Sequence, residues 1–130
     1  MTEKLKYTLE YGMKRVSVPM LWHYISSATG LSSWFADQVD INGKTYTFHW
    51  EGTSQTASLV SMRSGAYVRF HWTSDGKERT YFEMRITRSE MTDGTTLVVT
   101  DHADDEDDRD EMTTVWDQQI GALRHVMGGS

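Results

Sequence analysis

The sequence predicts an α+β fold, in which a curved antiparallel sheet of six to seven strands wraps a long C-terminal helix. Three observations lead to this fold class. First, apolar and polar residues alternate in several short runs, as in strands with one buried face. Second, turn signals separate these runs and leave no room for the crossover helices of a parallel sheet. Third, the only amphipathic stretch long enough to cover the apolar face of the sheet lies at residues 112–127.

The chain begins with a predicted strand and a predicted helix. Residues 4–10 alternate between polar and apolar side chains, which indicates a strand. A helix is expected next, with Ser17 as its N-cap and Pro19 in its first turn, where no backbone N–H is needed. Gly30 is expected to end this helix in a left-handed conformation.

A second, very short helix is expected directly after Gly30. Leu31, Trp34 and Phe35 have the spacing i, i+3, i+4, so one helical turn capped by Ser32 would bring all three to one side. Whether this turn is a fixed plug or a movable lid is not determined by the sequence.

Five alternating runs follow, at residues 44–50, 54–62, 67–72, 81–87 and 95–102. Pairs of turn residues, Asn-Gly, Ser-Gly and Asp-Gly, lie between them. The side chains predicted to face the helix are those of Tyr46, Phe48, Trp50, Val68, Phe70, Trp72, Phe82, Met84 and Ile86. The outer face then carries His49, Arg69, His71, Glu83 and Arg85, as plain surface or as a dimer contact.

The last helix has a continuous apolar stripe. Its predicted members are Met112, Trp116, Ile120, Leu123 and Met127, widened by Val115, Ala122 and Val126. Gly121 lies in mid-helix, where glycine is unfavourable relative to alanine, so we expect it to allow a close approach of the helix to the sheet.

Length and composition exclude several classes of protein. The 130 residues suit one domain, expected at 1–127 and followed by a flexible tail at 128–130. The absence of cysteine excludes disulfides and cysteine metal sites. No apolar run approaches the ~20 residues of a membrane helix, and the N-terminus lacks the apolar region of a secretory signal. We therefore expect a cytoplasmic protein that does not insert into membranes.

Negative charge is concentrated in residues 101–111, which hold eight acidic residues and one arginine. The net charge of the chain is −6, so the remainder is close to neutral and offers no basic face for nucleic acid. We expect this acidic segment to be a solvated, partly mobile loop before the last helix. Its role stays open between complementing the helix dipole, repelling wrong partners, binding cations weakly and contacting a basic protein surface.

The inward aromatic side chains admit two interpretations. They form either a solid core or the wall of a pocket for a hydrophobic small molecule or lipid. The candidate ligand-binding residues are Trp34, Phe35, Tyr46, Phe48, Trp50, Phe70, Trp72, Phe82, Met84, Trp116 and Ile120.

No metal site, cofactor or catalytic set is identified in the sequence. His49 and His71 occupy two Phe-His-Trp repeats, but a strand is expected between them, which would place their backbones about 9–10 Å apart. Asp101 is the one catalytic candidate, as a base, if the alternation of residues 95–102 continues and turns it inward. The alternative, which we favour, is that the strand has already ended and Asp101 is solvated.

Six segments in this order resemble a known superfamily: LWHYISSATGLSSWFA, INGKTYTFHW, YVRFHW, FEMRIT, GTTLVVTDHA and VWDQQIGAL. Together they resemble the START-like or SRPBCC superfamily, whose fold is the helix-grip, and within it the homologues of the activator of heat-shock protein 90 ATPase. The resemblance implies that residues 31–36 form the short second helix, which helps to close one end of a cavity under the sheet. The acidic segment departs from the family pattern.

The resemblance leaves three functions open, because members of this superfamily include lipid carriers, receptors, cyclases and chaperone regulators. The leading hypothesis is a non-enzymatic domain that binds a hydrophobic small molecule or lipid between sheet and last helix, with Trp34 and Phe35 at the mouth. The second is a protein-interaction module that regulates a chaperone or another partner. The third is a cyclase or hydrolase that uses the same cavity. Ligand identity, biological process and oligomeric state are not determined by the sequence.

Overall fold

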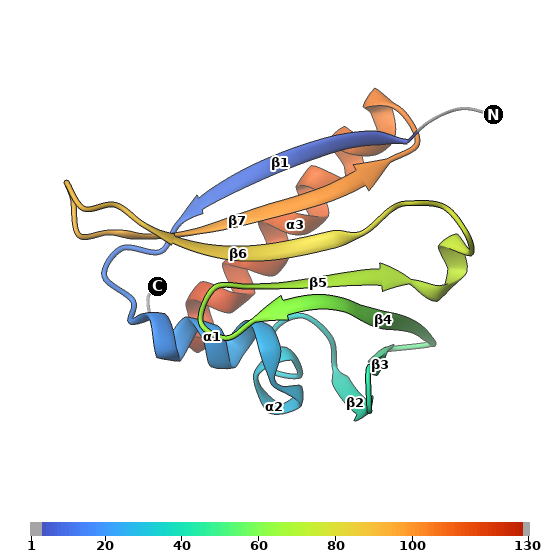
Figure 1. The fold of residues 1–130 in the computed structure, drawn as a ribbon, viewed down its shortest axis with the longest axis horizontal. Coiled ribbons are helices and arrows are strands. Elements are labelled where there is room, and N and C mark those ends of the chain that lie inside the picture. Colours follow the sequence, from blue (N-terminus) through green and yellow to red (C-terminus); the bar gives the residue numbers. More distant parts are fainter. Residues whose placement is uncertain (1–3, 129–130) are drawn as a thin grey trace.

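The computed structural model describes residues 4–128 and shows an antiparallel sheet curved around a long helix, as the sequence predicts (Figure 1). Of the expected tail, residues 129 and 130 lie outside the described part of the chain. The elements in chain order are β1 (Leu5–Gly12), α1 (Val18–Ser26), α2 (Ala28–Leu31), β2 (Gln38–Asn42), β3 (Thr45–Trp50), β4 (Thr53–Arg63), β5 (Tyr67–Trp72), the 3₁₀ turn η1 (Thr73–Asp75), β6 (Phe82–Arg88), β7 (Thr95–Ala103) and α3 (Glu106–Val126).

The sheet has seven strands in the order β1-β7-β6-β5-β4-β3-β2, and every neighbouring pair is antiparallel. Strands β2 to β7 follow one another as a meander, whereas β1 pairs with β7 from the far end of the chain. The strand β2 adds to the six alternating runs of the sequence and forms a hairpin with β3, in which Asn42 is paired with Thr45. The helix α3 lies behind the sheet in the view of Figure 1 and packs on its inner face.

The alternation of the strands decides which side chains are buried, as predicted. Phe48, Phe70, Met84 and Val99 are fully buried on the inner face, whereas their chain neighbours face outward. The stripe of α3 is narrower than predicted, because Trp116, Ile120 and Leu123 are buried while Val115 and Ala122 are exposed.

The expectation for Gly121 is wrong. This glycine lies on the exposed side of α3, and a Cβ atom added to it would meet nothing within 4 Å. The close approach that the sequence suggested for Gly121 is found at Gly30 instead. A Cβ atom on Gly30 would lie 2.1 Å from the backbone oxygen of His23, because α2 packs directly on the backbone of α1.

The two short helices begin and end differently from the prediction. Ser17 caps α1 as expected and accepts a hydrogen bond from the N–H of Met20. The helix ends at Ser26, however, and Ser27 caps α2 by accepting from the N–H of Gly30 (2.9 Å). Gly30 is therefore a helical residue and not a left-handed end. Ser32 follows α2 and is not its N-cap, although Leu31, Trp34 and Phe35 are all buried, as the spacing predicts.

The acidic segment is not a loop. It contains the end of β7 and the first six residues of α3, which begins at Glu106, six residues before the predicted start. Asp105 is the N-cap and accepts a hydrogen bond from the N–H of Asp108 (2.8 Å). Acidic residues in the first turn stabilise a helix through its dipole, so the charges that suggested a loop favour the helix start.

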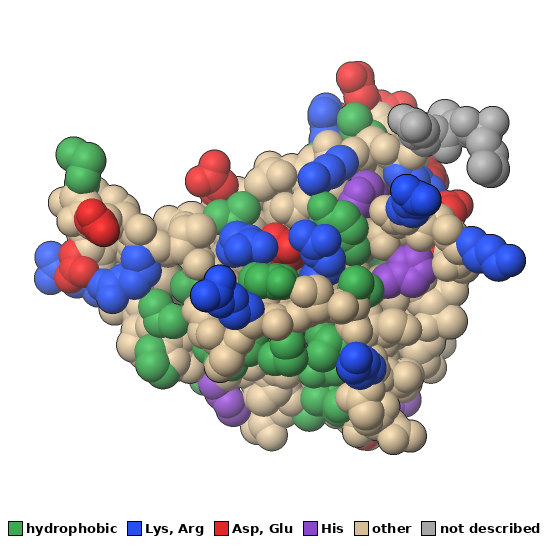
Figure 2. All heavy atoms as spheres, in the orientation of Figure 1, with side chains coloured by type: hydrophobic (Ala, Val, Ile, Leu, Met, Phe, Trp, Pro, Cys, Tyr) green, Lys and Arg blue, Asp and Glu red, His purple; other side chains and the backbone are tan. Residues whose placement is uncertain are grey.

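The outer face of the sheet carries one buried ion-pair cluster. Glu83 is 6% exposed, and its carboxylate accepts hydrogen bonds from the guanidinium groups of Arg69 (2.8 Å) and Arg85 (3.0 Å). Burial raises the pKa of Glu83, but the two guanidinium groups outweigh this effect and hold the pKa below its ordinary value. Figure 2 shows this face, with Lys and Arg side chains gathered over the middle of the sheet.

Candidate functional site

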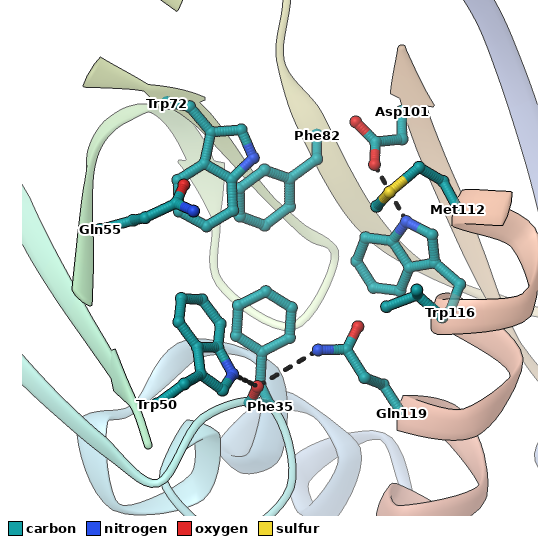
Figure 3. A pocket seen from close by; sticks show the side chains of 10 residues that line it. Phe35, Trp50, Gln55, Trp72, Phe82, Asp101, Met112, Trp116 and Gln119 are labelled. Atoms are coloured by element: carbon teal, nitrogen blue, oxygen red, sulfur yellow. Dashed lines mark hydrogen bonds between the residues drawn. The ribbon is translucent and has the colours of Figure 1, made fainter. Parts of the chain in front are cut away.

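A cavity of about 330 Å³ lies between one end of the sheet and the N-terminal half of α3 (Figure 3). Because neighbouring strands are antiparallel, the ends of β3, β5 and β7 meet the starts of β4 and β6 at this end of the sheet. The volume falls in the range of about 300–1,000 Å³ that is usual for small-molecule sites. The lining residues are Phe35, Trp50, Gln55, Trp72, Phe82, Asp101, Met112, Val115, Trp116 and Gln119.

Five aromatic rings form a closed circuit in the wall of this cavity. The distance between ring centroids is 4.9 Å for Phe82 and Trp72, 6.4 Å for Trp72 and Trp50, and 6.0 Å for Trp50 and Phe35. Trp116 closes the circuit at 5.9 Å from Phe35 and 6.2 Å from Phe82. We call these five residues the aromatic wall. Such ring pairs attract one another beyond their burial, which keeps the wall ordered.

The aromatic wall is tied together by hydrogen bonds at the carbonyl of Phe35. This oxygen accepts from Trp50 Nε1 (3.0 Å) and from Gln119 Nε2 (3.2 Å), as Figure 3 shows. The turn after α2 is thereby joined both to β3 and to α3. The position of Phe35 in the cavity consequently depends on three separate elements.

The structure divides the predicted ligand-binding residues into two groups. Phe35, Trp50, Trp72, Phe82 and Trp116 line the cavity. The other six lie in the core, are at most 7% exposed and do not line it: Trp34, Tyr46, Phe48, Phe70, Met84 and Ile120.

Trp34 and Phe35 are neighbours in the sequence and were predicted to act together, but they occupy different positions in the structure. Its Nε1 donates to the backbone oxygen of Tyr24 (2.8 Å), and its ring packs edge-on against Phe35, with centroids 5.4 Å apart. Trp34 thus fastens α1 to the turn after α2, whereas Phe35 reaches the cavity.

Apart from Asp101, which was predicted only as a catalytic candidate, four lining residues were not among the predicted site residues: Gln55, Met112, Val115 and Gln119. The last three share a spacing with Trp116, since positions 112, 115, 116 and 119 lie at i, i+3, i+4 and i+7 on one face of α3. The sequence signal for this lining face is a polar residue, Gln119, at a position where the helical spacing from Met112, Val115 and Trp116 would otherwise predict an apolar one. Gln55 carries no comparable signal, because it is an exposed residue near the start of β4.

Asp101 is buried in the wall of the cavity. It is 9% exposed and lies within β7, which extends to Ala103, so the interpretation that we favoured, a solvated residue after the strand, is wrong. Its Oδ2 accepts hydrogen bonds from Trp116 Nε1 (3.0 Å) and the hydroxyl of Tyr7 (3.5 Å). Its Oδ1 accepts from the N–H of His102 (2.8 Å). Burial raises the pKa of Asp101 above its ordinary value.

A second, polar cavity of about 180 Å³ adjoins the first, and Trp72, Asp101 and Met112 line both. The polar cavity is also lined by acidic and basic side chains, which are Lys4, Asp75, His102, Asp104 and Asp108. Lys4 forms ion pairs with Asp104 and Glu78. Asp101 therefore lies between an aromatic space and an acidic one.

His49 and His71, the two histidines considered as metal ligands, contact protein groups instead. His49 contacts Asp40 (2.8 Å), whereas His71 contacts the carbonyl oxygens of Thr80 and Gly76. These carbonyls raise the pKa of His71, since only the protonated ring donates to both. The strand β4 lies between them, as predicted. Across residues 4–128, no three His, Cys, Asp or Glu side chains are grouped in a way that would hold a metal ion.

Within the same described residues, no helix has both the length and the apolar character needed to cross a membrane.

Comparison with known proteins identifies the superfamily. A family model for the START-like superfamily domain matches residues 1–129. A protein from Bacteroides fragilis, solved by NMR in solution, is 38% identical, with a TM-score of 0.69, and the match covers 97% of this chain and 93% of that one. No curated protein matches the chain.

More distant solved structures share the fold. The Aha1 dimer from Colwellia psychrerythraea is 15% identical with a TM-score of 0.73, and the match covers 92% of both chains. CalU16 from Micromonospora echinospora is 18% identical with a TM-score of 0.69, over 95% of this chain and 73% of that one. The match of the family model over almost the whole sequence, together with the sheet curved around α3, shows that this chain belongs to the START-like superfamily.

Proposed function

We propose that this protein binds a hydrophobic small molecule or lipid in the cavity between the sheet and α3. The observation that carries the proposal is the cavity of about 330 Å³ that is lined by the aromatic wall and by residues of β4, β7 and α3. A mostly apolar pocket with a few convergent polar groups is the usual form of a small-molecule site. The polar groups here are the carboxyl of Asp101 and the side chains of Gln55 and Gln119.

The cavity favours a compact ligand. Its volume is near the lower limit of about 300 Å³ for drug-sized ligands, so a molecule of one or two rings or one short chain fits better than a two-chain lipid. Phe35, Phe82 and Trp116 would contact the ligand from the buried side. The exposed residues Gln55 and Val115 would lie at the mouth.

Native mass spectrometry tests the proposal with two matched substitutions. Val115→Trp adds bulk at the mouth, on a residue that is 41% exposed and lines the cavity. Val60→Trp is the control, because Val60 is 56% exposed on β4 and does not line this cavity. We expect freshly purified protein to carry a bound small molecule that Val115→Trp loses and Val60→Trp keeps. A molecule retained equally by both variants would place the binding elsewhere.

The chaperone-regulating function remains the alternative proposal. It draws on the shared fold with the Aha1 dimer, and at 15% identity this likeness concerns the fold alone. Affinity capture from lysate, with the acidic residues at 104–108 changed to serine, tests it, since a partner held by the α3 N-terminus would be lost. Serine at position 105 keeps an N-cap, so the helix start is preserved.

An enzyme of the cyclase or hydrolase type is the weakest of the three. Among the described residues that line the aromatic cavity, Asp101 is the only one with a titratable side chain. General acid–base chemistry at a single ligand usually needs a second group with a different protonation state. Incubation of a ligand found by mass spectrometry, followed by analysis for a changed mass, tests this function directly.

A further inference from the structure

The first observation concerns the charge of Asp101. Its three hydrogen-bond donors are the indole of Trp116, the hydroxyl of Tyr7 and a backbone N–H, all of them neutral. Within residues 4–128, no lysine, arginine or histidine forms an ion pair with it. Glu83 shows the contrasting case, a buried carboxylate that has two guanidinium partners. Buried charges are usually paired, so Asp101 lacks the cation that this protein supplies to its other buried acid.

The second observation concerns the aromatic wall. Three of its five rings are indoles, those of Trp50, Trp72 and Trp116. Indole faces attract cations more strongly than the other aromatic side chains do, and cages of several rings recognise organic ammonium groups. Figure 3 shows the rings grouped around a common space, with the carboxyl of Asp101 at its edge and bonded to Trp116.

The third observation is the acidic surrounding of this space. The adjoining polar cavity brings Asp75, Asp104 and Asp108 near Asp101, and Lys4 is the one lysine or arginine among residues 4–128 that lines it. Carboxylates beside a low-dielectric cavity raise the local concentration of cations and lower that of anions.

We propose that the ligand is a hydrophobic ammonium compound, whose cationic nitrogen lies among the rings of the aromatic wall and beside Asp101. This inference rests on the proposed function and adds the charge of the ligand to it. The rings supply cation–π attraction and apolar contact, whereas the carboxylate supplies the opposite charge. The ammonium group of the ligand is in turn the cationic partner that Asp101 lacks.

Two probes of the same shape test the charge directly. Benzyltrimethylammonium and neopentylbenzene differ only by a charged nitrogen in place of a carbon, and both are small enough for the cavity. Titrations followed by ¹H–¹⁵N NMR give a separate indole N–H signal for each of the five tryptophans. We expect both probes to move the signals of Trp50, Trp72 and Trp116, while those of Trp22 and Trp34, which do not line the cavity, stay in place.

The expected result is that the ammonium probe binds about tenfold more tightly than its neutral isostere. Asp101→Asn should reduce this preference about fivefold, because it removes the negative charge beside the ligand. Trp72→Leu should also reduce the preference, since it removes one ring and keeps Asp101.

The outcomes separate this inference from the proposed function. Equal or tighter binding of neopentylbenzene to the wild-type protein would overturn the cationic ligand and still support a hydrophobic site. Failure of both probes to move the three cavity indoles would overturn the two together. If Asp101→Asn keeps the full preference for the ammonium probe, Asp101 does not interact with the cationic nitrogen. The wild-type comparison needs no substitution, so it decides the charge even if a variant fails to fold.

Discussion

Replacing Gly30 by alanine should destabilise this protein far more than its single added methyl group suggests. The new Cβ atom would lie 2.1 Å from the backbone oxygen of His23 and 2.7 Å from the Cα atom of Tyr24. Ordinary contacts begin at about 3.4 Å, so α1 and α2 would have to separate by about 1 Å. The obstacle is backbone on both sides, and no side-chain rotation relieves it.

The loss of stability in Gly30→Ala has two sources, the overpacked contact itself and the weakened bonding between α1 and the segment after it. Overpacking of a buried site costs about 1–3 kcal/mol. The hydrogen bond from Trp34 Nε1 to the carbonyl of Tyr24 crosses the same junction and contributes about 1 kcal/mol. We therefore expect Gly30→Ala to lower the free energy of unfolding by about 3 kcal/mol, a large part of the 5–15 kcal/mol of a typical domain.

Urea unfolding measures this change, and Gly121→Ala is the matched control. Gly121 lies in mid-helix with open space around it, so alanine there should raise the free energy of unfolding by about 0.5–1 kcal/mol through helix propensity. The same substitution is thus expected to have opposite effects at two positions. A change below about 0.5 kcal/mol for Gly30→Ala, or destabilisation by Gly121→Ala, would refute this account of the α1–α2 junction and of α3.

Substitutions at three further positions test the helix start, the buried carboxyl and the core tryptophan. Asp105→Ala should cost about 1 kcal/mol in urea unfolding, because it removes the N-cap of α3, and Asp105→Ser should restore most of this loss. Asp101→Asn should become more stable relative to wild type as the pH rises from 4 to 7. Burial raises the folded-state pKa of Asp101 above the unfolded value of about 3.9, so the wild type loses stability as this carboxyl ionises. Trp34→Phe should cost about 1–2 kcal/mol through the lost hydrogen bond to Tyr24, and leave the cavity indole signals unmoved.

Each of these expectations has an outcome that contradicts it. Equal losses for Asp105→Ala and Asp105→Ser would show that side-chain capping does not set the start of α3. A stability difference between Asp101→Asn and wild type that is constant from pH 4 to 7 would mean that the carboxyl is not desolvated in the folded protein. If the indole N–H signals of the cavity tryptophans shift in Trp34→Phe, Trp34 contributes to the ligand site.

Local sequence patterns determined much of this fold. A period of two residues decides which side chains of a strand face inward, so Phe48, Phe70 and Met84 could be placed in the interior without knowing their neighbours. Turn pairs decide where a hairpin reverses, and Ser17 could be named as an N-cap, because these interactions involve residues close in sequence. The superfamily was also recognisable from the order of six segments.

Only the tertiary structure decided which inward residues meet the cavity. Phe70 and Trp72 share a strand and a face, yet Phe70 is closed in the core and Trp72 lines the cavity at the strand end. The difference depends on where α3 crosses the curved sheet, and this crossing is set by contacts between residues far apart in the chain. For the same reason the pattern could not decide between a buried and a solvated Asp101, whose environment comes from β1 and α3, or identify Gly30 as the point where two helices touch. The sequence thus determined the inner face of each strand, and long-range packing decided which part of that face remains open to a ligand.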